Sequence, residues 1–162
     1  MKQQLVNKIV DHLDNELNAL LEAAKNAHIA AIDEQSVAET QYDTLAIEAG
    51  YLAEGQSRRV DELKQAMAAF TQLNAQLKQQ ANPYQLIKCG ALIQLSQDKQ
   101  RQHYFFLAPA AAGFRCEING QKFTVITPNS PMGKALLDKT VDDECIVDLG
   151  DKQHIDDIIF VK

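Results

Sequence analysis

The first eighty residues carry an apolar pattern of helical spacing that no proline interrupts before Pro83. In residues 1–32 the apolar positions step by four and three over more than three heptads, as in the a/d seam of a coiled coil. These positions are Val6, Val10, Leu13, Leu17, Leu20, Ala24, Ala27 and Ala31. Further apolar residues widen the stripe, so that the base of the helix can contact another domain: Leu5, Ile9, Leu21 and Ile29. We therefore predict one long amphipathic helix over residues 1–32.

A second seam of the same spacing predicts another helix, from about Ser36 to Gln80. Its positions are Tyr42, Ala46, Ala49, Ala53, Gln56, Val60, Leu63, Met67, Phe70, Asn74 and Leu77. Ser36 and Glu39 fit a capping box that starts this helix, and Asn82-Pro83 ends it. The short connection between the helices favours antiparallel neighbours. Residues 1–80 are thus predicted to form an antiparallel coiled-coil hairpin.

The tip of this hairpin, near residues 33–43, is acidic. Residues 26–57 contain no Lys or Arg, and six acids: Asp33, Glu34, Glu39, Asp43, Glu48 and Glu54. The first four are candidate partner-binding residues at the tip. One hypothesis is a metal-binding tip, because carboxylates are common ligands of divalent cations. The alternative is a solvated tip whose acidity suits a partner with a positively charged cleft or pore, with Glu39 used by the capping box.

Beyond Pro83 the apolar pattern changes to a period of two, with β-branched and aromatic runs. It predicts strands over residues 91–95, 103–107, 114–118, 122–126, 145–149 and 155–161. Asn119-Gly120 predicts a type I′ hairpin turn. Ser130 and Pro131 predict the N-cap and first position of a helix over residues 132–138. We predict an α+β chain whose second domain, residues 81–162, is an antiparallel sheet with one helix.

Composition excludes several classes of function. The net charge is −6 and the pI is about 5.1, which argues against free-standing binding to nucleic acid. Cys89, Cys116 and Cys145 form no CxxC pair, so we expect reduced thiols and no zinc site. No apolar run is long enough to cross a membrane, and the first residues lack the apolar segment of a signal peptide. These features predict a cytoplasmic protein.

The run TPNSPMGKALLDKTVDDE, residues 127–144, resembles the segment N-S-P-x-x-x-A-L-[IL]-x-K-x-V-G-D-E of the bacterial Gre transcription elongation factors. It differs at Asp142, where the family usually has Gly. Cys89-Gly90-Ala91, before a predicted strand, also resembles the family. Gre factors join an antiparallel coiled-coil hairpin to an FKBP-like domain, so the resemblance covers nearly the whole chain.

The resemblance implies a partner and a mechanism. In the family, the globular domain binds at the mouth of the secondary channel of RNA polymerase and the coiled coil enters the channel. Carboxylates at the tip help to hold the second Mg²⁺, and the polymerase active site then hydrolyses backtracked RNA. The implied partner is the RNA polymerase core, with no sequence-specific nucleic acid, no membrane and no cofactor except a possible Mg²⁺ shared in the polymerase active site.

The family's tip motif, D-L-x-E-N-A-E-Y followed by Gly, can be aligned through Tyr42 and Gly50. In this register Gln35 and Ala38 occupy the positions of the two family acids. Both carboxylates are therefore absent from their usual positions, and Asp33, Glu34 and Glu39 lie only one or two residues away. The alignment favours a regulator that enters the channel without efficient transcript cleavage. A cleavage-stimulating factor that uses displaced tip acids is the alternative.

We expect a monomeric binding regulator with no catalytic or metal-binding residues of its own. Ser130 and Pro131 are the candidate partner-binding residues of the globular domain. Ser130 is interpreted as a helix cap and not as a nucleophile, because no His and Asp have recognisable spacing to it. Two other functions stay open: a peptidyl-prolyl isomerase, on the FKBP-like resemblance alone, and a coiled-coil chaperone or assembly module.

Overall fold

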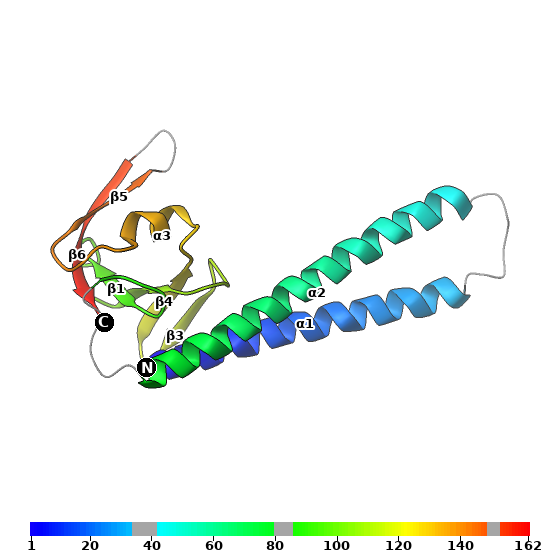
Figure 1. Cartoon of the computed structure of the whole chain (residues 1–162), viewed down its shortest axis with the longest axis horizontal. Helices are drawn as coiled ribbons and strands as arrows, with labels where there is room; N and C mark the ends of the chain where they lie inside the picture. The colour runs from blue at the N-terminus through cyan, green and yellow to red at the C-terminus, as the bar shows by residue number, and fades with distance from the viewer. Residues whose placement is uncertain (34–41, 80–85, 149–152) are drawn as a thin grey trace. The chain divides into compact units, whose positions relative to one another are not determined.

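The computed structural model describes residues 1–33, 42–79, 86–148 and 153–162, with side chains described outside residues 27–54. Two long helices come first, α1 (Lys2–Asp33) and α2 (Tyr42–Gln79). They are followed in the described chain by β1 (Leu92–Leu95), β2 (His103–Leu107), β3 (Arg115–Ile118), β4 (Gln121–Ile126), α3 (Pro131–Leu136), β5 (Glu144–Asp148) and β6 (Gln153–Val161) (Figure 1). The α+β class, with paired helices before a sheet that carries one helix, is confirmed.

Two side-chain contacts show that α1 and α2 run antiparallel. Gln3 Nε2 donates a hydrogen bond to Asn74 Oδ1, and Arg59 Nε donates one to Glu16 Oε1 at 3.2 Å. A residue near the start of α1 thus contacts one near the end of α2, and a residue further along α1 contacts one earlier in α2. Two helices of opposite direction require this order. The predicted capping box at Ser36 and the predicted end at Asn82-Pro83 lie outside the described residues.

The predicted seam is buried where side chains are described, but unevenly. Val6, Leu13, Leu63 and Phe70 each expose 4% or less. Val10, Leu17, Leu20, Val60 and Met67 are only half-buried. Leu5 and Ile9, which widen the stripe, are fully buried, whereas Leu21 is 47% exposed. The wider apolar face is therefore used at the start of α1 and is open to solvent at Leu21.

The chain divides into two compact units. The first contains Met1–Val10 and Ala68–Lys162, and the second contains Asp11–Met67. The predicted domains, residues 1–80 and 81–162, follow the change of secondary structure. Compactness instead groups the beginning of α1 and the end of α2 with the sheet.

The sheet has the strand order β3-β4-β2-β1-β6-β5. The prediction of a wholly antiparallel sheet is wrong for one pair, since β2 and β4 run parallel from His103↔Lys122 to Leu107↔Ile126. The β3–β4 hairpin turns at Asn119 and Gly120, whose positive φ values of 53° and 78° confirm the predicted turn type. Strand β4 lies between β2 and β3, parallel to β2 and antiparallel to β3.

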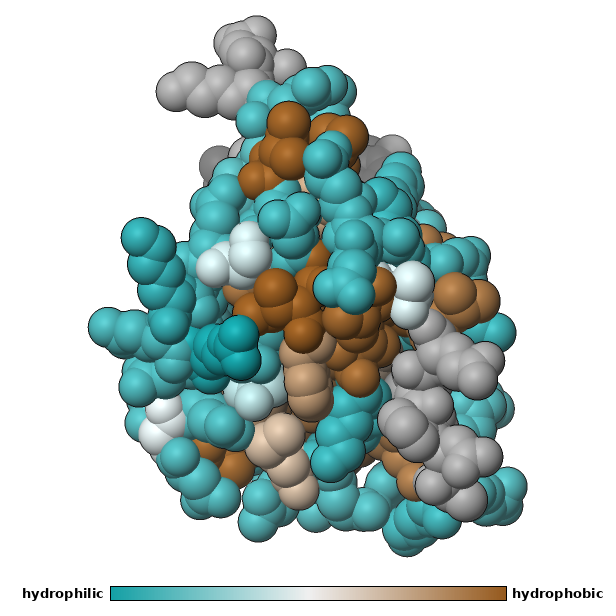
Figure 2. All heavy atoms as spheres, turned by 90° about the vertical axis from the view of Figure 1, so that its left-hand side faces the viewer, coloured by the Kyte–Doolittle hydropathy of each residue, from teal (hydrophilic) through white to brown (hydrophobic). Residues whose placement is uncertain are grey.

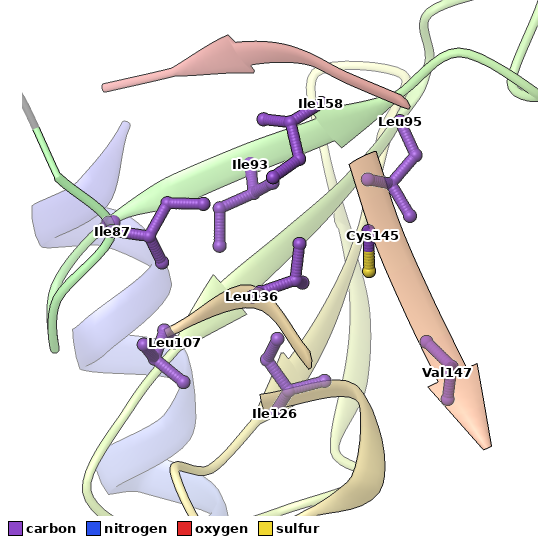
Figure 3. Packing of buried hydrophobic residues seen from close by; sticks show 10 residues of the cluster. Ile87, Ile93, Leu95, Leu107, Ile126, Leu136, Cys145, Val147 and Ile158 are labelled. Atoms are coloured by element: carbon purple, nitrogen blue, oxygen red, sulfur yellow. The ribbon is translucent and has the colours of Figure 1, made fainter. Parts of the chain in front are cut away.

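One face of the sheet carries α3 over an apolar cluster (Figure 3). Leu136 of α3 meets Ile93 and Leu95 of β1, Ile158 of β6, and Cys145 and Val147 of β5. Every one of these side chains exposes 5% or less. This cluster fixes α3, and with it the turn that precedes the helix.

The opposite face of the sheet is also apolar and buried. Tyr104 stacks on Phe123 with ring centroids 5.4 Å apart, and Phe106 and Val125 are their buried neighbours on the same strands. Leu5, Ile9 and Phe70 of the helices belong to the same compact unit and are fully buried. We infer that these ends of α1 and α2 cover this face, which accounts for the widened stripe of the sequence.

Candidate partner-binding site at the first turn of α3

The turn before α3 is held by the Ser130 hydroxyl. Ser130 Oγ accepts hydrogen bonds from the N–H groups of Gly133 at 3.1 Å and Thr127 at 3.3 Å, and donates to Thr127 O at 2.7 Å. Pro131 occupies the first helical position, where no N–H is needed. The predicted N-cap and N1 roles are confirmed. The hydroxyl is fully engaged in the turn, which agrees with its interpretation as a cap.

Gly133 makes this turn possible. A Cβ atom built on Gly133 would lie 1.8 Å from Thr127 O and 2.7 Å from Thr127 C, both of them backbone atoms. Any other residue would therefore push the turn away from α3. Periodicity could not have identified this glycine, because α3 has only six residues and Gly133 is its third.

A small apolar groove of about 250 Å³ lies beside the turn. It is lined by Ala112, Gly113, Thr124, Val125, Ile126, Ser130, Pro131, Met132, Val147 and His154. Pro131 is exposed at its rim, whereas Met132 packs against the apolar cluster. A volume of this size accommodates one or two apolar side chains of a partner rather than a larger ligand.

The wall of the groove at His154 is backed by a buried carboxylate. Asp156 exposes 5%, and its Oδ1 accepts from Ser96 Oγ at 2.7 Å and from the N–H groups of Gln97 and Asp157 at 3.1 and 2.9 Å. Its Oδ2 lies 3.9 Å from His154 Nε2. Three donors satisfy this carboxylate, so it ties the loop after β1 to β6.

The predicted tip residues are not brought together by any described contact. Asp33 is the last residue of α1 and Asp43 is the second of α2, but neither side chain is described. Glu34 and Glu39 lie outside the described residues, as do Gln35 and Ala38. Among the residues that are described, no group of three His, Cys, Asp or Glu could hold a metal ion.

None of the three cysteines forms a disulfide bond. Cys145 is buried in β5, Cys116 is half-buried in β3, and Cys89 is half-buried just before Gly90. Burial raises the pKa of each thiol, and the charge of Lys8 opposes this rise at Cys116 only in part. A raised pKa favours the unreactive thiol over the thiolate.

A second groove, of about 700 Å³, was not predicted from the sequence. It is lined by Asp98, Gln100, Gln102, His103, Phe105, Arg115, Cys116, Glu117, Lys122, Phe123 and Thr124. His103 Nε2 lies 2.8 Å from Thr124 Oγ1, and burial lowers the pKa of His103, which favours the neutral imidazole. Asp98 accepts from the backbone N–H of His103 at 2.7 Å, so the acid does not orient the ring as in a catalytic triad. In the sequence, a single His within a predicted strand did not indicate this groove.

Arg59 of α2 takes part in a small network of ion pairs. Its guanidinium contacts Glu16 of α1 and lies 3.1 Å from Glu62 of α2, and both carboxylates raise the pKa of Arg59. All three side chains are exposed, so the network contributes little to stability.

The described helices include none that is long and apolar enough to cross a membrane. The chain is an α+β protein, and its candidate site is the turn at Ser130 together with the apolar groove beside it.

No protein-family model matches the chain, and no curated protein does. Among solved structures it is similar to Gfh1 of Thermus aquaticus, with 16% identity, a TM-score of 0.35, and coverage of 98% of this chain and 92% of that chain. A second structure, of the transcription factor Gfh1, has 14% identity and a TM-score of 0.37, with coverage of 98% of this chain and 92% of that chain. The structure of GreA factor homolog 1 (Gfh1) of Thermus thermophilus has 13% identity and a TM-score of 0.35, with coverage of 99% of this chain and 94% of that chain. At these values the likeness transfers neither a function nor a residue's role to this chain.

Proposed function

We propose that this protein is a Gre-like regulator of transcription elongation. It binds bacterial RNA polymerase and inserts the tip of its helix pair into the secondary channel. The observation that supports this most is the segment 127–144. Two of the residues by which it resembles the Gre factors, Ser130 and Pro131, form the capped turn beside the apolar groove. A side-chain pocket next to a rigid, exposed proline is suited to binding a protein surface.

We further propose that the regulator acts without efficient transcript cleavage. Recruitment of a second Mg²⁺ requires carboxylates in defined positions. Gln35 and Ala38 stand at the two positions where the family motif has acids. A neutral amide and a methyl group cannot replace them, so no step of the mechanism is assigned to a bound metal ion. The chain would act by occupying the channel, and any hydrolysis would be carried out by the polymerase.

Co-elution with purified core RNA polymerase on a sizing column tests the partner. We expect a stoichiometric complex. A Pro131→Asp variant is expected to elute apart from the polymerase. Leu86→Ala, at an exposed leucine outside the segment 127–144, is the control and is expected to co-elute with it. Failure of the unaltered protein to bind core polymerase at micromolar concentrations would remove the basis of the proposal.

A backtracked elongation complex tests whether the protein acts without efficient transcript cleavage. The unaltered protein is expected to leave the RNA length unchanged beyond the intrinsic rate, and the double variant Gln35→Asp with Ala38→Glu to gain Mg²⁺-dependent shortening. Shortening by the unaltered protein that is abolished by Asp33→Ala, Glu34→Ala and Glu39→Ala together would establish the alternative, cleavage through displaced acids.

A further inference from the structure

Strand β5 forms one edge of the sheet. It is last in the order β3-β4-β2-β1-β6-β5 and pairs only with β6 among the strands of the described chain. Its side chains alternate, with Cys145 and Val147 in the apolar cluster that also holds Leu136 of α3. Helix α3 therefore packs on the inner face of β5, and none of the described strands lies along its outer edge.

The backbone of Ile146 is directed toward this edge. Asp142 N–H donates to Ile158 O at 2.8 Å, and Ile158 N–H donates to Asp143 O at 3.0 Å. From this pair the antiparallel alternation makes Cys145↔Asp156 and Val147↔His154 the hydrogen-bonded pairs with β6. The intervening residues Glu144, Ile146 and Asp148 consequently direct their N–H and C=O groups away from β6. Lys139 Nζ donates to Glu144 O, which agrees with that direction.

The outer face of the β5–β6 hairpin has an apolar centre and an acidic rim. Ile146 and Ile155 are paired across the strands and are 45% and 51% exposed, which is unusual for such large apolar side chains. Glu144, Asp148 and Asp157 are exposed on the same face. Figure 2 views this side of the molecule and shows apolar atoms standing among hydrophilic ones.

The charge pattern disfavours a second copy of the chain on this edge. If β5 paired with itself in antiparallel register about Ile146, Glu144 of one copy would lie opposite Asp148 of the other, twice in each pair. Like charges directly opposite one another destabilise a strand pair. A strand with positive charges at the same two positions would be attracted instead, in either direction, because the acids lie symmetrically about Ile146.

We propose that the β5 edge binds an extended basic polypeptide segment of the pattern basic-x-apolar-x-basic by adding it as a seventh strand to the sheet. Its apolar side chain packs on Ile146 and Ile155, and its two cations face Glu144 and Asp148. The backbone of Ile146 supplies one N–H donor and one C=O acceptor. The groove beside Ser130 meets the inner face of this hairpin at Val147 and His154, whereas the proposed surface is its outer face and the edge of β5. The inference does not depend on the proposed function.

The test uses the full chain and a fluorescein-labelled peptide, Thr-Lys-Thr-Val-Thr-Lys-Thr, in a low-salt anisotropy titration without polymerase. We expect saturable one-to-one binding, and no binding of the peptide with Glu in place of both Lys. Ile146→Pro removes the edge N–H without removing a bond to β6, and is expected to weaken binding at least about tenfold. Glu144→Lys with Asp148→Lys is expected to weaken it similarly, and serves if the proline variant does not fold.

Glu117→Pro is the matched control. Glu117 lies on β3, the opposite edge strand, between the pairs Cys116↔Phe123 and Ile118↔Gln121, and it is exposed. Binding should be unchanged in this variant. The proposal is overturned if the basic peptide does not bind, if Glu117→Pro weakens binding as much as Ile146→Pro, or if the acidic peptide binds equally well. A concentration-dependent dimer that Ile146→Pro converts to monomer would identify a second copy as the occupant, and would equally overturn it.

Discussion

Phe70 and Leu63 occupy the same seam position of α2, one heptad apart, yet they belong to different compact units. Phe70 exposes 0% and Leu63 exposes 2%. The difference lies in their neighbours. Leu5, Ile9 and Leu73 are buried in the unit of Phe70, whereas Val60 and Met67, the seam positions on either side of Leu63, are half-buried. The same sequence pattern thus gives a closed core where a sheet is present and a narrow seam where only two helices are paired.

The largest expected effect comes from Phe70→Ala. A cavity enclosed on all sides cannot collapse, so the variant should lose about 4 kcal/mol of unfolding free energy. Urea denaturation followed by circular dichroism measures this loss. Hydrogen exchange should accelerate at the amides of β2 and β4 as well as in α2. Acceleration confined to α2 would show that the helix end does not share the core of the sheet.

Gly133→Ala should come next, with a loss of about 3 kcal/mol, because the new methyl group overlaps Thr127 O and forces the turn apart. Gly55→Ala is the matched control in the other unit. Apart from the neighbouring backbone of α2, no described atom lies within 4 Å of a Cβ at Gly55. Alanine is the better helix former, so this variant should gain up to about 1 kcal/mol. Equal losses in both variants would contradict the assigned role of Gly133.

Leu63→Ala should cost about 2 kcal/mol, near the low end for a buried leucine, because a two-helix seam can relax toward solvent. The sharper measurement is native-state hydrogen exchange. Protection should fall within residues 55–67 while the amides of β1 and β6 keep theirs. Loss of protection throughout the sheet would mean that the two units unfold together.

Lys2 should make the unfolding free energy of the unit that contains the sheet vary with pH in the alkaline range. Burial, and next the charge of Lys162, lower the pKa of Lys2 from 10.5 to about 8. Between these values the unfolded state binds more protons than the folded state, so unfolding free energy rises from about pH 8 to pH 10.5. Lys2→Met should be more stable below pH 8, by about 1 kcal/mol after allowance for solvent screening. Denaturation of both proteins at about pH 7 and pH 10 checks whether this advantage disappears in alkali.

The smallest expected effect is that of Arg59→Ala. The contacts of Arg59 with Glu16 and Glu62 are exposed, so the loss should stay below about 0.5 kcal/mol and vanish in high salt. Thermal melting at low and high salt measures both. A salt-independent loss above about 1 kcal/mol would show that the seam in residues 11–67 depends on packing by the arginine side chain.

The local elements followed from the sequence alone, because each depends on neighbouring residues. Helix periodicity predicted α1 and α2, and Asn119-Gly120 predicted its turn through the positive φ that both residues tolerate. Ser130 and Pro131 predicted the cap of α3, since a hydroxyl oxygen and a missing N–H suit those two positions. The four acids of the predicted tip remain predictions, because their side chains are not described.

Tertiary structure decided whatever depends on residues far apart in the chain. The parallel pairing of β2 with β4 joins strands that are not consecutive in the chain, and no local pattern encodes it. Gly133 is required because Thr127 O approaches it, and His103 meets Thr124 only because their strands are adjacent. The exposed pair Ile146 and Ile155 reads as ordinary strand core in sequence. Only the tertiary structure shows that the outer face of the β5–β6 hairpin is uncovered, which leaves these two side chains in contact with solvent.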